Sequence, residues 1–290
     1  MNVDWDDLKA VLHVVRKGTL AAAATELGVN YTTVARRIAR AERALGTVLF
    51  DRLADGYRPV EAALVVARHA SEMETQSLAV IRGIAGRDAR LSGKLTVTAP
   101  QLLVGPHLTE VIRTFSQTHP EVDLHLRASN DLADLSRREA DLAIRISRTP
   151  GDALKGLRLT DQHSASFASP DWAEQIKNTP ERTIDWVVYD ALGTPPKGLD
   201  PRFQNNRVVM TCDDMTAMVG AAQAGLGVVR MPVFLGRATP GLVQVPVLPA
   251  QPYAEIWVVA HADVWASAKV AAFREVLVPY FKCNRAAFTS

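Results

Sequence analysis

The sequence predicts an α/β protein that begins with a winged helix-turn-helix, continues through one long helix and ends in a larger α/β domain. Three observations support this fold class. Short helical patterns separated by glycines open the chain, a heptad-like pattern follows them, and strand and helix patterns alternate from Lys94 onward. At about 150 residues per domain, 290 residues predict two domains and a linking element.

The composition is that of an ordinary globular protein and excludes several other classes. Hydrophobic residues make up 48% and charged residues 22% of the chain, and no apolar stretch approaches the ~20 residues of a membrane helix. The segment Met1–Asp7 is acidic where a secretory signal would be basic. Two cysteines, Cys212 and Cys283, fit a reducing compartment. We therefore expect a cytoplasmic protein that contacts no membrane.

The positive charge is concentrated at the start of the chain. The net charge is +2; residues 1–60 contain nine Lys and Arg against seven Asp and Glu, whereas residues 61–290 contain 24 of each sign. All the cations between residues 30 and 58 are arginines. Because the planar guanidinium binds phosphate and guanine through two hydrogen bonds, this pattern favours nucleic-acid binding over a solvated helix face.

Three helical patterns at the N-terminus have the arrangement of a helix-turn-helix. The apolar spacing predicts helices over residues 6–16, 20–27 and 30–45, with Thr19 and Asn30 as N-caps of the second and third. A short helix, a glycine turn and a longer helix are typical of the DNA-binding motif whose second helix enters the major groove.

The third helix and the segment after it carry the candidate DNA-binding residues. In helix-turn-helix proteins the first residues of the second helix meet base edges, and flanking cations meet phosphates. A polar turn at residues 54–56 predicts a small hairpin, or wing, that brings two more arginines to the DNA backbone. The candidates are Asn30, Tyr31, Thr32, Thr33, Arg36, Arg37, Arg40, Arg52 and Arg58.

A long helix without Gly or Pro is predicted over residues 61–82. Its apolar residues alternate at three and four positions over about three heptads, or roughly 35 Å of helix. This pattern is typical of a dimerisation helix, and the alternative is that the stripe packs on its own domain. The seam comprises Ala63, Val66, Ala70, Met73, Ser77, Val80 and Ile84. Gly83, Gly86 and Gly93 then mark a hinge.

The rest of the chain alternates between strand-like and helix-like periods, which predicts an α/β sheet. Expected strands cover residues 95–98, 122–127, 142–146, 164–168, 186–189, 208–211, 228–230 and 256–260. Expected helices cover residues 107–118, 132–139, 215–224 and 265–281. Ligands in such sheets bind beyond the carboxyl ends of the strands. A binding site is therefore expected among residues 99–103, 129–131, 147–149, 190–194 and 212–215.

Four motifs resemble those of the LysR-type transcriptional regulators, and the resemblance covers residues 4–282. One specific motif is the run Gly18–Asn30. The second specific motif consists of Ile38, Glu42, Leu45, Gly46, Leu49, Phe50 and Arg52. The two weaker motifs are residues 115–122 with 140–145, and residues 224–229 followed by Pro232.

The resemblance implies both an architecture and a function. The implied parts are a winged helix-turn-helix over residues 1–60, a linker and dimerisation helix with its hinge over 61–90, and an effector-binding domain like a type 2 periplasmic binding protein over 91–290, with lobe I at about 91–160 and 262–290 and lobe II at about 161–261. The implied function is that of a sequence-specific transcriptional regulator of double-stranded promoter DNA. A small molecule between the lobes modulates binding, subunits associate through the helix over residues 61–84 as a dimer or tetramer, and RNA polymerase is a further partner.

The resemblance also divides the DNA-binding candidates by role. It places Thr32, Thr33 and Arg36 near the bases and Arg37, Arg40, Arg52 and Arg58 on the DNA backbone. For Arg36 the alternative is a phosphate contact that carries no sequence information. Tyr31 stands where the family often has Gln, and Ala35 stands where it often has Ser. The operator sequence of a relative therefore cannot be transferred to this chain.

The resemblance places the effector at the loop after the first strand of the α/β domain and at loops of both lobes. Gln101 offers an amide to a carboxylate, and Arg145 would either neutralise an organic acid or serve as a structural ion-pair partner. The candidates are Pro100, Gln101, Leu102, Ser129, Asn130, Arg145, Thr211 and Asp214. Cys212, beside this cleft, is interpreted either as a redox sensor or as an ordinary buried thiol.

The alternative function is an enzyme with a DNA-binding arm, arranged like the biotin protein ligases. Such an enzyme requires a nucleotide-binding loop rich in glycine and lysine, but Gly225–Gly227 lacks the third glycine and precedes a strand. The seven histidines have no metal-ligand spacing, and no Gly-x-Ser-x-Gly occurs. A transport-type binding protein would account for the second half of the chain alone. We expect no catalytic residues, no metal and no cofactor.

Overall fold

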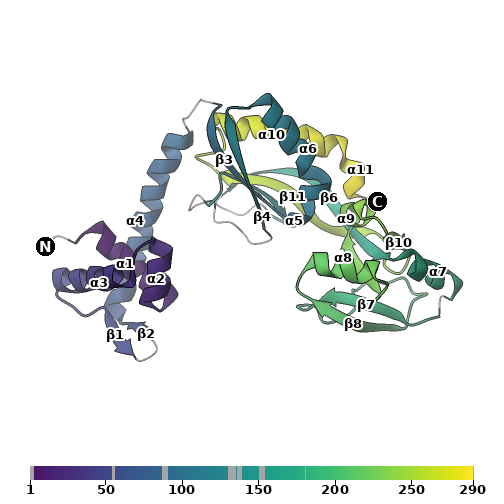
Figure 1. Cartoon of the computed structure of the whole chain (residues 1–290), viewed down its shortest axis with the longest axis horizontal. Coiled ribbons are helices and arrows are strands. Elements are labelled where there is room, and N and C mark those ends of the chain that lie inside the picture. The colour runs from purple at the N-terminus through teal and green to yellow at the C-terminus, as the bar shows by residue number, and fades with distance from the viewer. Residues whose placement is uncertain are drawn as a thin grey trace. The chain divides into compact units, whose positions relative to one another are not determined.

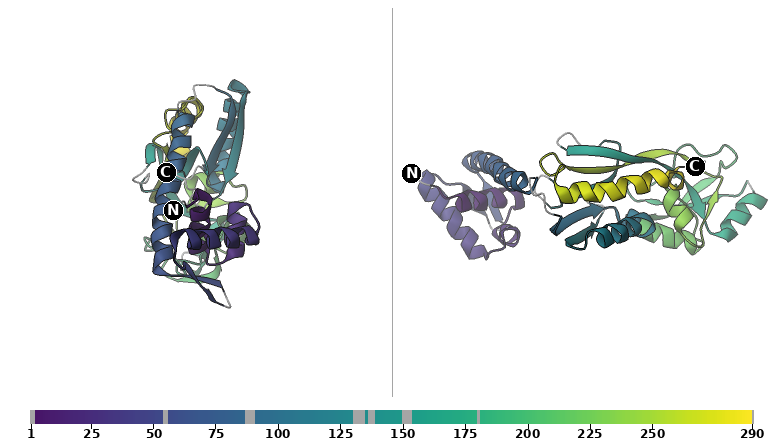
Figure 2. Two further views of the ribbon diagram at one scale, coloured as in Figure 1. Left: turned by 90° about the vertical axis from the view of Figure 1, so that its left-hand side faces the viewer. Right: turned by 90° about the horizontal axis from the view of Figure 1, so that it is seen from above.

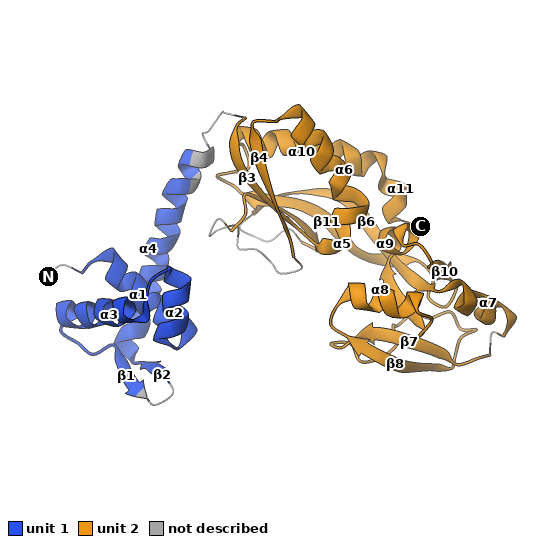
Figure 3. Ribbon diagram, viewed as in Figure 1, with its two compact units in different colours: residues 1–84 blue, residues 85–290 orange. Residues whose placement is uncertain are grey.

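The chain folds as two compact units, residues 1–84 and residues 85–290 (Figure 3). Each unit has a hydrophobic core of its own. The computed structural model describes residues 3–53, 56–86, 91–129, 135, 139–149, 154–179 and 181–289.

The first unit is a winged helix-turn-helix (Figure 1). Its elements are α1 (Trp5–Lys17), α2 (Leu20–Leu27), α3 (Tyr31–Leu45), β1 (Phe50–Leu53), β2 (Gly56–Pro59) and α4 (Glu61–Gly86). The three predicted helices, the hairpin and the long helix are therefore confirmed. Helices α1, α2 and α3 pack together because their apolar faces meet at Val11, Ala23, Val34 and Ile38, all of which are buried.

The turns of this unit follow from its capping residues. Thr19 Oγ1 accepts a hydrogen bond from the Ala22 N–H at 3.2 Å, so the predicted N-cap of α2 is confirmed. Gly28 ends α2 in the left-handed conformation, with φ at 64°. Asn30 is the N-cap residue of α3, as predicted, but its side chain makes no capping hydrogen bond. The Asn30 carbonyl itself accepts the Thr33 N–H at 3.0 Å, which is the donor that a capping side chain would have satisfied.

The first half of α4 packs against α1. Ala67 and Ala70 form a buried cluster with Leu12. Arg16 Nη1 donates a hydrogen bond of 2.9 Å to Glu74 Oε2, which ties the two helices further along. This half of α4 is therefore part of the helix-turn-helix unit.

The structure divides the predicted heptad seam of α4. Ala63 and Ala70 are buried within their own unit, so the prediction of one continuous partner-facing seam is wrong for these two residues. The small alanine side chains allow α4 to approach the unit closely there. Met73, Val80 and Ile84 remain 45%, 65% and 70% exposed. The part of the predicted seam that is most exposed within the unit therefore lies on the second half of α4.

The second unit is an α/β domain built on one mixed sheet (Figure 1). Its strands are β3 (Gly93–Ala99), β4 (Val122–Ala128), β5 (Leu142–Ser147), β6 (Leu154–Ala168), β7 (Ile184–Tyr189), β8 (Asn206–Cys212), β9 (Val228–Pro232), β10 (Val243–Val245) and β11 (Gln251–His261). Its helices are α5 (Gln101–Leu103), η1 (Val104–Leu108, one π-helical turn), α6 (Thr109–Thr118), α7 (Pro170–Asn178), α8 (Met215–Gln223), α9 (Val233–Ala238), α10 (Ala268–Cys283) and α11 (Arg285–Phe288).

All eight predicted strands are present, and β6 and β11 extend well beyond the predicted segments. The predicted helix over residues 132–139 falls almost entirely outside the described residues. Five elements were not predicted, namely α5, α7, α9, α11 and β10. Helix α7 begins at Pro170 after the capping Ser169, whose hydroxyl accepts the Trp172 N–H. That Ser-Pro pair was a helix-start signal in the sequence.

Two parallel halves of the sheet are joined by two long antiparallel strands. The strand order is β4-β3-β5-β11-β6-β9-β7-β8, with β10 paired to β6. Strand β3 pairs in parallel with β4 and β5, and β7 pairs in parallel with β8 and β9. Strands β6 and β11 run antiparallel between the halves. This is the two-lobed α/β arrangement that the family resemblance implies.

Each half of the sheet is covered by its own helices. In the first half α6 and α10 lie side by side over the sheet (Figures 1 and 2), and the rings of Phe115 and Phe273 meet edge to face at 5.1 Å. In the second half α8 covers β7 and β9 through Met215 and Met218. Trp186 of β7 is fully buried and donates its indole N–H to Asn206 at 2.7 Å.

A buried histidine lies in an aromatic cluster beside the first of these cores. His107 Nδ1 lies 3.1 Å from the Tyr280 hydroxyl, and the ring centroids of His107 and Phe288 are 4.4 Å apart. Burial lowers the pKa of His107 from 6.5 to about 4. The imidazole is therefore neutral in the folded protein at pH 7.

We expect this histidine to make the second unit less stable in mild acid. Because the pKa of His107 is lower in the folded than in the unfolded state, its contribution is complete above pH 6.5 and is lost as the pH falls towards 4. The free energy of unfolding should fall by roughly 2 kcal/mol between pH 7.5 and pH 5 from this group alone. Urea unfolding at both pH values measures it. A His107→Phe variant that loses as much stability as the wild type over this interval would contradict the assignment.

Candidate DNA-binding face and effector pocket

One face of α3 presents small hydroxyl side chains and an arginine to solvent. At about 100° per residue, Thr32, Thr33 and Arg36 lie within about 60° of one direction around the helix. These three residues are called the recognition face below. Tyr31 is 61% exposed. It lies in the first turn of α3, about 140° around the helix axis from Arg36. Asn30 is exposed beside it at the N-cap.

The arginines of α3 differ in their partners. Arg37 Nη2 donates to Asp6 Oδ2 at 2.6 Å, and Arg40 donates through Nε and Nη2 to Asp7 Oδ1 at 3.1 and 2.6 Å. The hydrogen bonds that Arg40 donates to the Asp7 carboxylate raise the pKa of Arg40. Arg36 is exposed and has no ion pair within the part of the chain that the structure describes. Of the three predicted arginines of α3, Arg36 is thus available to a ligand, whereas the other two hold α3 against α1.

We expect Asp7→Asn to strengthen general DNA attraction while weakening the fold. Asp7 is only 4% exposed, and its loss of charge frees the guanidinium of Arg40 for a phosphate. The slope of log affinity against log salt should steepen by about one unit on non-specific duplex DNA, and the melting temperature should fall. Fluorescence anisotropy at several salt concentrations measures the slope. Asp6→Asn is the matched control, since Asp6 is exposed and should change the melting temperature less; an equal fall in both variants contradicts the role given to Asp7.

The two arginines of the wing lie on opposite faces of the hairpin. Arg58 is opposite Asp51, and Arg52 is opposite Tyr57 in the antiparallel pair β1–β2. Because side chains alternate between faces along a strand, Arg52 shares its face with Phe50 and Tyr57, whose rings pack at 5.9 Å. Both arginines are exposed. The sequence did not reveal this difference, which sets Arg58 on the outer face of the wing.

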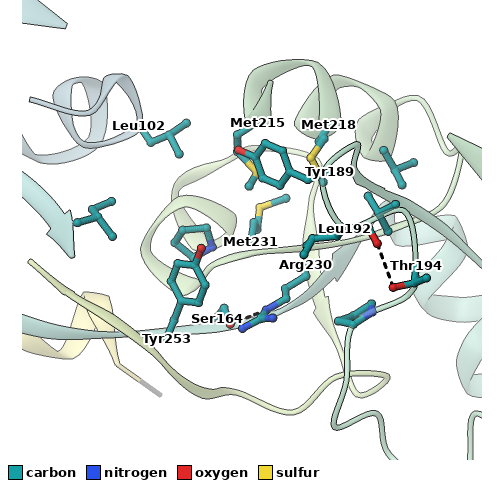
Figure 4. Close-up of a pocket in the computed structure, with 15 residues that line it drawn as sticks. Leu102, Ser164, Tyr189, Leu192, Thr194, Met215, Met218, Arg230, Met231 and Tyr253 are labelled. Atoms are coloured by element: carbon teal, nitrogen blue, oxygen red, sulfur yellow. Dashed lines mark hydrogen bonds between the residues drawn. The ribbon is translucent and has the colours of Figure 1, made fainter. Parts of the chain in front are cut away.

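A pocket in the second unit lies where β7 and β9 end and α8 begins (Figure 4). Its volume is about 170 Å³. It is lined by Leu102, Ile146, Ser164, Val187, Val188, Tyr189, Leu192, Thr194, Pro196, Met215, Met218, Arg230, Met231, Pro232 and Tyr253. These residues come from both halves of the sheet and from the crossing strands β6 and β11. This set of residues is called the Arg230 pocket below.

A single arginine with fixed geometry gives this pocket its polarity. Arg230 Nε donates to Ser164 Oγ at 2.9 Å, and the guanidinium carbon lies 5.1 Å from the centroid of the Tyr253 ring (Figure 4). Burial raises the pKa of Tyr189, so its hydroxyl keeps its proton at pH 7 and can donate a hydrogen bond. The pocket therefore combines a cation and hydroxyl groups with walls of methionine and leucine.

The structure brings one of the predicted effector residues, Leu102, into the Arg230 pocket. Pro100 is the N-cap residue of α5, and the Gln101 amide lies 3.5 Å from the Ala128 carbonyl on the exposed side of that helix. The Ser129 N–H donates to the Ala99 carbonyl. These residues lie at the predicted strand end but outside the lining of this pocket.

The remaining predicted effector residues serve the fold or lie elsewhere. Arg145 is next to Ile146 on β5, and because Ile146 lines the pocket, Arg145 projects from the other face of the sheet. Asp214 Oδ1 caps α8 by accepting the Ala217 N–H at 3.0 Å. Thr211 is exposed on β8 and does not line the pocket. Asn130 lies outside the described residues.

Sequence reasoning missed Ser164, Arg230 and Tyr253. The segment around Arg230 was assigned as an apolar strand, and a charged residue inside such a strand was a usable signal that the strand end faces a polar site. Ser164 and Tyr253 carried no comparable signal, because they reach the pocket only through the long crossing strands β6 and β11.

Other site chemistry is limited among the residues that the structure describes. No three His, Cys, Asp or Glu side chains there are grouped to hold a metal ion. No described helix is both long and apolar enough to cross a membrane. Cys212 is half-buried at the end of β8, Cys283 is exposed at the end of α10, and both are free thiols.

A helix-turn-helix unit joined to a two-lobed α/β unit with a pocket is the architecture of a DNA-binding regulator that carries a ligand-sensing domain. Residues 5–64 match the family model described as "Bacterial regulatory helix-turn-helix protein, lysR family", and residues 88–282 match "LysR substrate binding domain". The chain belongs to the LysR family of bacterial transcriptional regulators, as its motifs predicted. Regulators of this family bind promoter DNA and small-molecule effectors and form oligomers.

Individual relatives agree with this family. The Mau operon transcriptional activator of Paracoccus denitrificans is 33% identical over 146 residues, which are 50% of this chain and 51% of that protein. The full-length structure of a variant of AphB, a Vibrio cholerae virulence activator, has a TM-score of 0.62 at 20% identity and covers 94% of this chain and 97% of that one. The structure of CbnR with its target DNA has a TM-score of 0.51 at 16% identity, with 96% and 99% covered. At these identities the solved structures support the fold alone.

Proposed function

We propose that this chain is a sequence-specific, promoter-binding regulator that reads DNA with the recognition face and Tyr31 of α3. The observation that carries the proposal is the unpaired, exposed Arg36 beside two hydroxyl side chains, next to arginines that are held by Asp6 and Asp7. A guanidinium free of protein partners has both edges available for the O6 and N7 acceptors of guanine. Thr32 and Thr33 suit contacts with a thymine methyl group or a phosphate.

The remaining DNA contacts in this proposal are to the backbone. Arg58, on the outer face of the wing, contacts a phosphate. Arg52, on the other face, contacts a phosphate when the β1–β2 hairpin enters the groove with its edge first. Arg37 and Arg40 position α3 and direct their remaining N–H groups to phosphates, but Asp6 and Asp7 balance their charge, so these two contacts add little to the salt slope. Each phosphate contact by an arginine without such a carboxylate partner contributes about one unit.

Self-association is assigned to the second half of α4. Met73 and Val80 are seven residues apart and Ile84 lies on the same side, so an apolar stripe of about three helical turns stays uncovered within the unit. A second copy of α4 buries this stripe and places two recognition helices on two half-sites.

The Arg230 pocket is the proposed effector site, and the protein itself acts without catalysis. Its position beyond the carboxyl ends of β7 and β9 is where ligands bind in α/β sheets, and residues from both lobes line it. Closure of the lobes on an effector changes the placement of the two DNA-binding units. The protein works in the cytoplasm, where promoter DNA and RNA polymerase are its macromolecular partners.

A gel-shift titration on DNA from the region upstream of the protein's own gene tests this function. The proposal predicts a discrete complex that survives excess non-specific DNA at moderate salt. Absence of any complex at low salt would overturn it.

A further inference from the structure

The Arg230 pocket carries one formal charge. Figure 4 shows the 15 lining residues, and Arg230 is the only Asp, Glu, Lys or Arg among them. One carboxylate would therefore balance the site, whereas a second negative charge on the same ligand would meet no cation in the lining. Such an uncompensated charge is expensive to remove from water.

The guanidinium of Arg230 is fixed with its outer end free. Its Nε is occupied by Ser164 Oγ at 2.9 Å, and its plane lies beside the Tyr253 ring. Among the described residues none accepts a hydrogen bond from its two Nη groups. A carboxylate takes two parallel hydrogen bonds from an arginine edge, and this pairing is stronger than one between neutral groups.

The rest of the lining defines the shape of the ligand's body. Leu102, Met215, Met218 and Met231 supply hydrocarbon and thioether surface, and the cavity measures about 170 Å³. An apolar cavity of about 150 Å³ accommodates benzene. Thioether sulfur atoms make favourable contacts with aromatic rings, so three methionines favour a ring over a chain of the same size.

We propose that the Arg230 pocket binds a monocarboxylate whose body is a single six-membered apolar ring, with the carboxylate on the Nη edge of Arg230 and the ring against the methionines. This assignment rests on the proposed function, because it names the chemical class of the effector for that site. Ser164 is a positioning residue in this arrangement, since it acts on the ligand through Arg230.

Three compounds of closely similar shape test the ligand class by isothermal titration with the full chain. Benzoate has the ring and one charge, benzamide has the ring without the charge, and terephthalate adds a second carboxylate opposite the first. Benzoate should bind at least about tenfold more tightly than either of the others. Equal binding of benzamide, equal binding of terephthalate, or no heat from millimolar benzoate would overturn the proposal.

Two variants assign the preference to Arg230. Arg230→Gln should lower the affinity for benzoate about tenfold or more and leave the affinity for benzamide unchanged. Arg207→Gln should bind both compounds as the wild type does. Arg207 is an exposed arginine of the same lobe, paired with Asp185 outside the pocket lining, which makes it a matched control. If Arg230→Gln does not fold, Ser164→Ala tests the assignment instead. This variant must bind benzoate more weakly than the wild type and benzamide equally well, and any other result overturns the assignment.

Failure of the ligand class and failure of the function are distinguishable. Arg230→Gln should form the same complex as the wild type with DNA from the protein's own upstream region. If that complex forms and benzoate shows no preference, the monocarboxylate assignment falls and the regulator stands. If neither wild type nor variant forms the complex, the function itself is wrong.

Discussion

Val80→Lys is expected to lower affinity for a two-half-site operator by about 100-fold or more. Val80 is 65% exposed in the stripe that also contains Met73 and Ile84. A lysine there places two like charges at the centre of the proposed helix pair, so each DNA-binding unit must bind alone. The first 60 residues carry an excess of only two positive charges, which gives weak non-specific attraction, and most operator affinity must then come from joining two units.

The measurement is sedimentation equilibrium for the oligomeric state and anisotropy for the operator. Leu64→Lys is the matched control: Leu64 is also an exposed apolar residue of α4, but it lies about 160° around the helix from Val80. We expect a dimer and unchanged operator binding from this variant. A Val80→Lys protein that remains dimeric would show that the pairing surface lies elsewhere.

Arg36→Ala is expected to weaken binding to the preferred sequence by about 5- to 150-fold, which corresponds to roughly 1–3 kcal/mol. The loss should be much smaller on scrambled DNA of the same length, because a base contact is lost. A phosphate contact would instead weaken both duplexes equally and lower the salt slope by about one unit. Anisotropy titrations of both duplexes at several salt concentrations separate these outcomes.

The control for Arg36→Ala is Arg113→Ala, which removes the same charge from an exposed position on α6 in the other unit. Its binding to both duplexes should match the wild type. Equal losses of Arg36→Ala on preferred and scrambled DNA would move Arg36 from the bases to the backbone.

The elements of the first unit were predictable because local chemistry determines them. Glycine and threonine set the helix ends, and the apolar period sets the buried faces. The ion pairs between α1 and α3 could not be predicted from the sequence. Asp6 and Asp7 are more than 30 positions from their partners Arg37 and Arg40, and they meet them only when α1 packs on α3. The heptad pattern of α4 likewise could not reveal that Ala63 and Ala70, in its first half, are already buried in the unit.

The Arg230 pocket, the proposed effector site, was less predictable for a topological reason. The carboxyl-end rule correctly pointed to the segments that contain Leu102, Leu192, Thr194 and Met215. The rule did not include β6 and β11, which join the two halves of the sheet and carry Ser164 and Tyr253. These two side chains hold Arg230, the one cation of the pocket lining. Arg145 was predicted either to neutralise an acid or to be a structural ion-pair partner. The alternation of side chains along β5 turns it away from the Arg230 pocket, and Arg230 is the cation in that lining.

Hydroxyl-radical footprinting of the protein on DNA from the region upstream of its own gene tests the central claim most directly. The account predicts two protected half-sites whose centres are one helical turn or a multiple of it apart, about 10.5 base pairs per turn. Val80→Lys should reduce this pattern to weak single half-sites, and Arg36→Ala should abolish it at concentrations where the wild type protects both. A footprint that has no half-site repeat, or one unchanged by Arg36→Ala, would contradict the account.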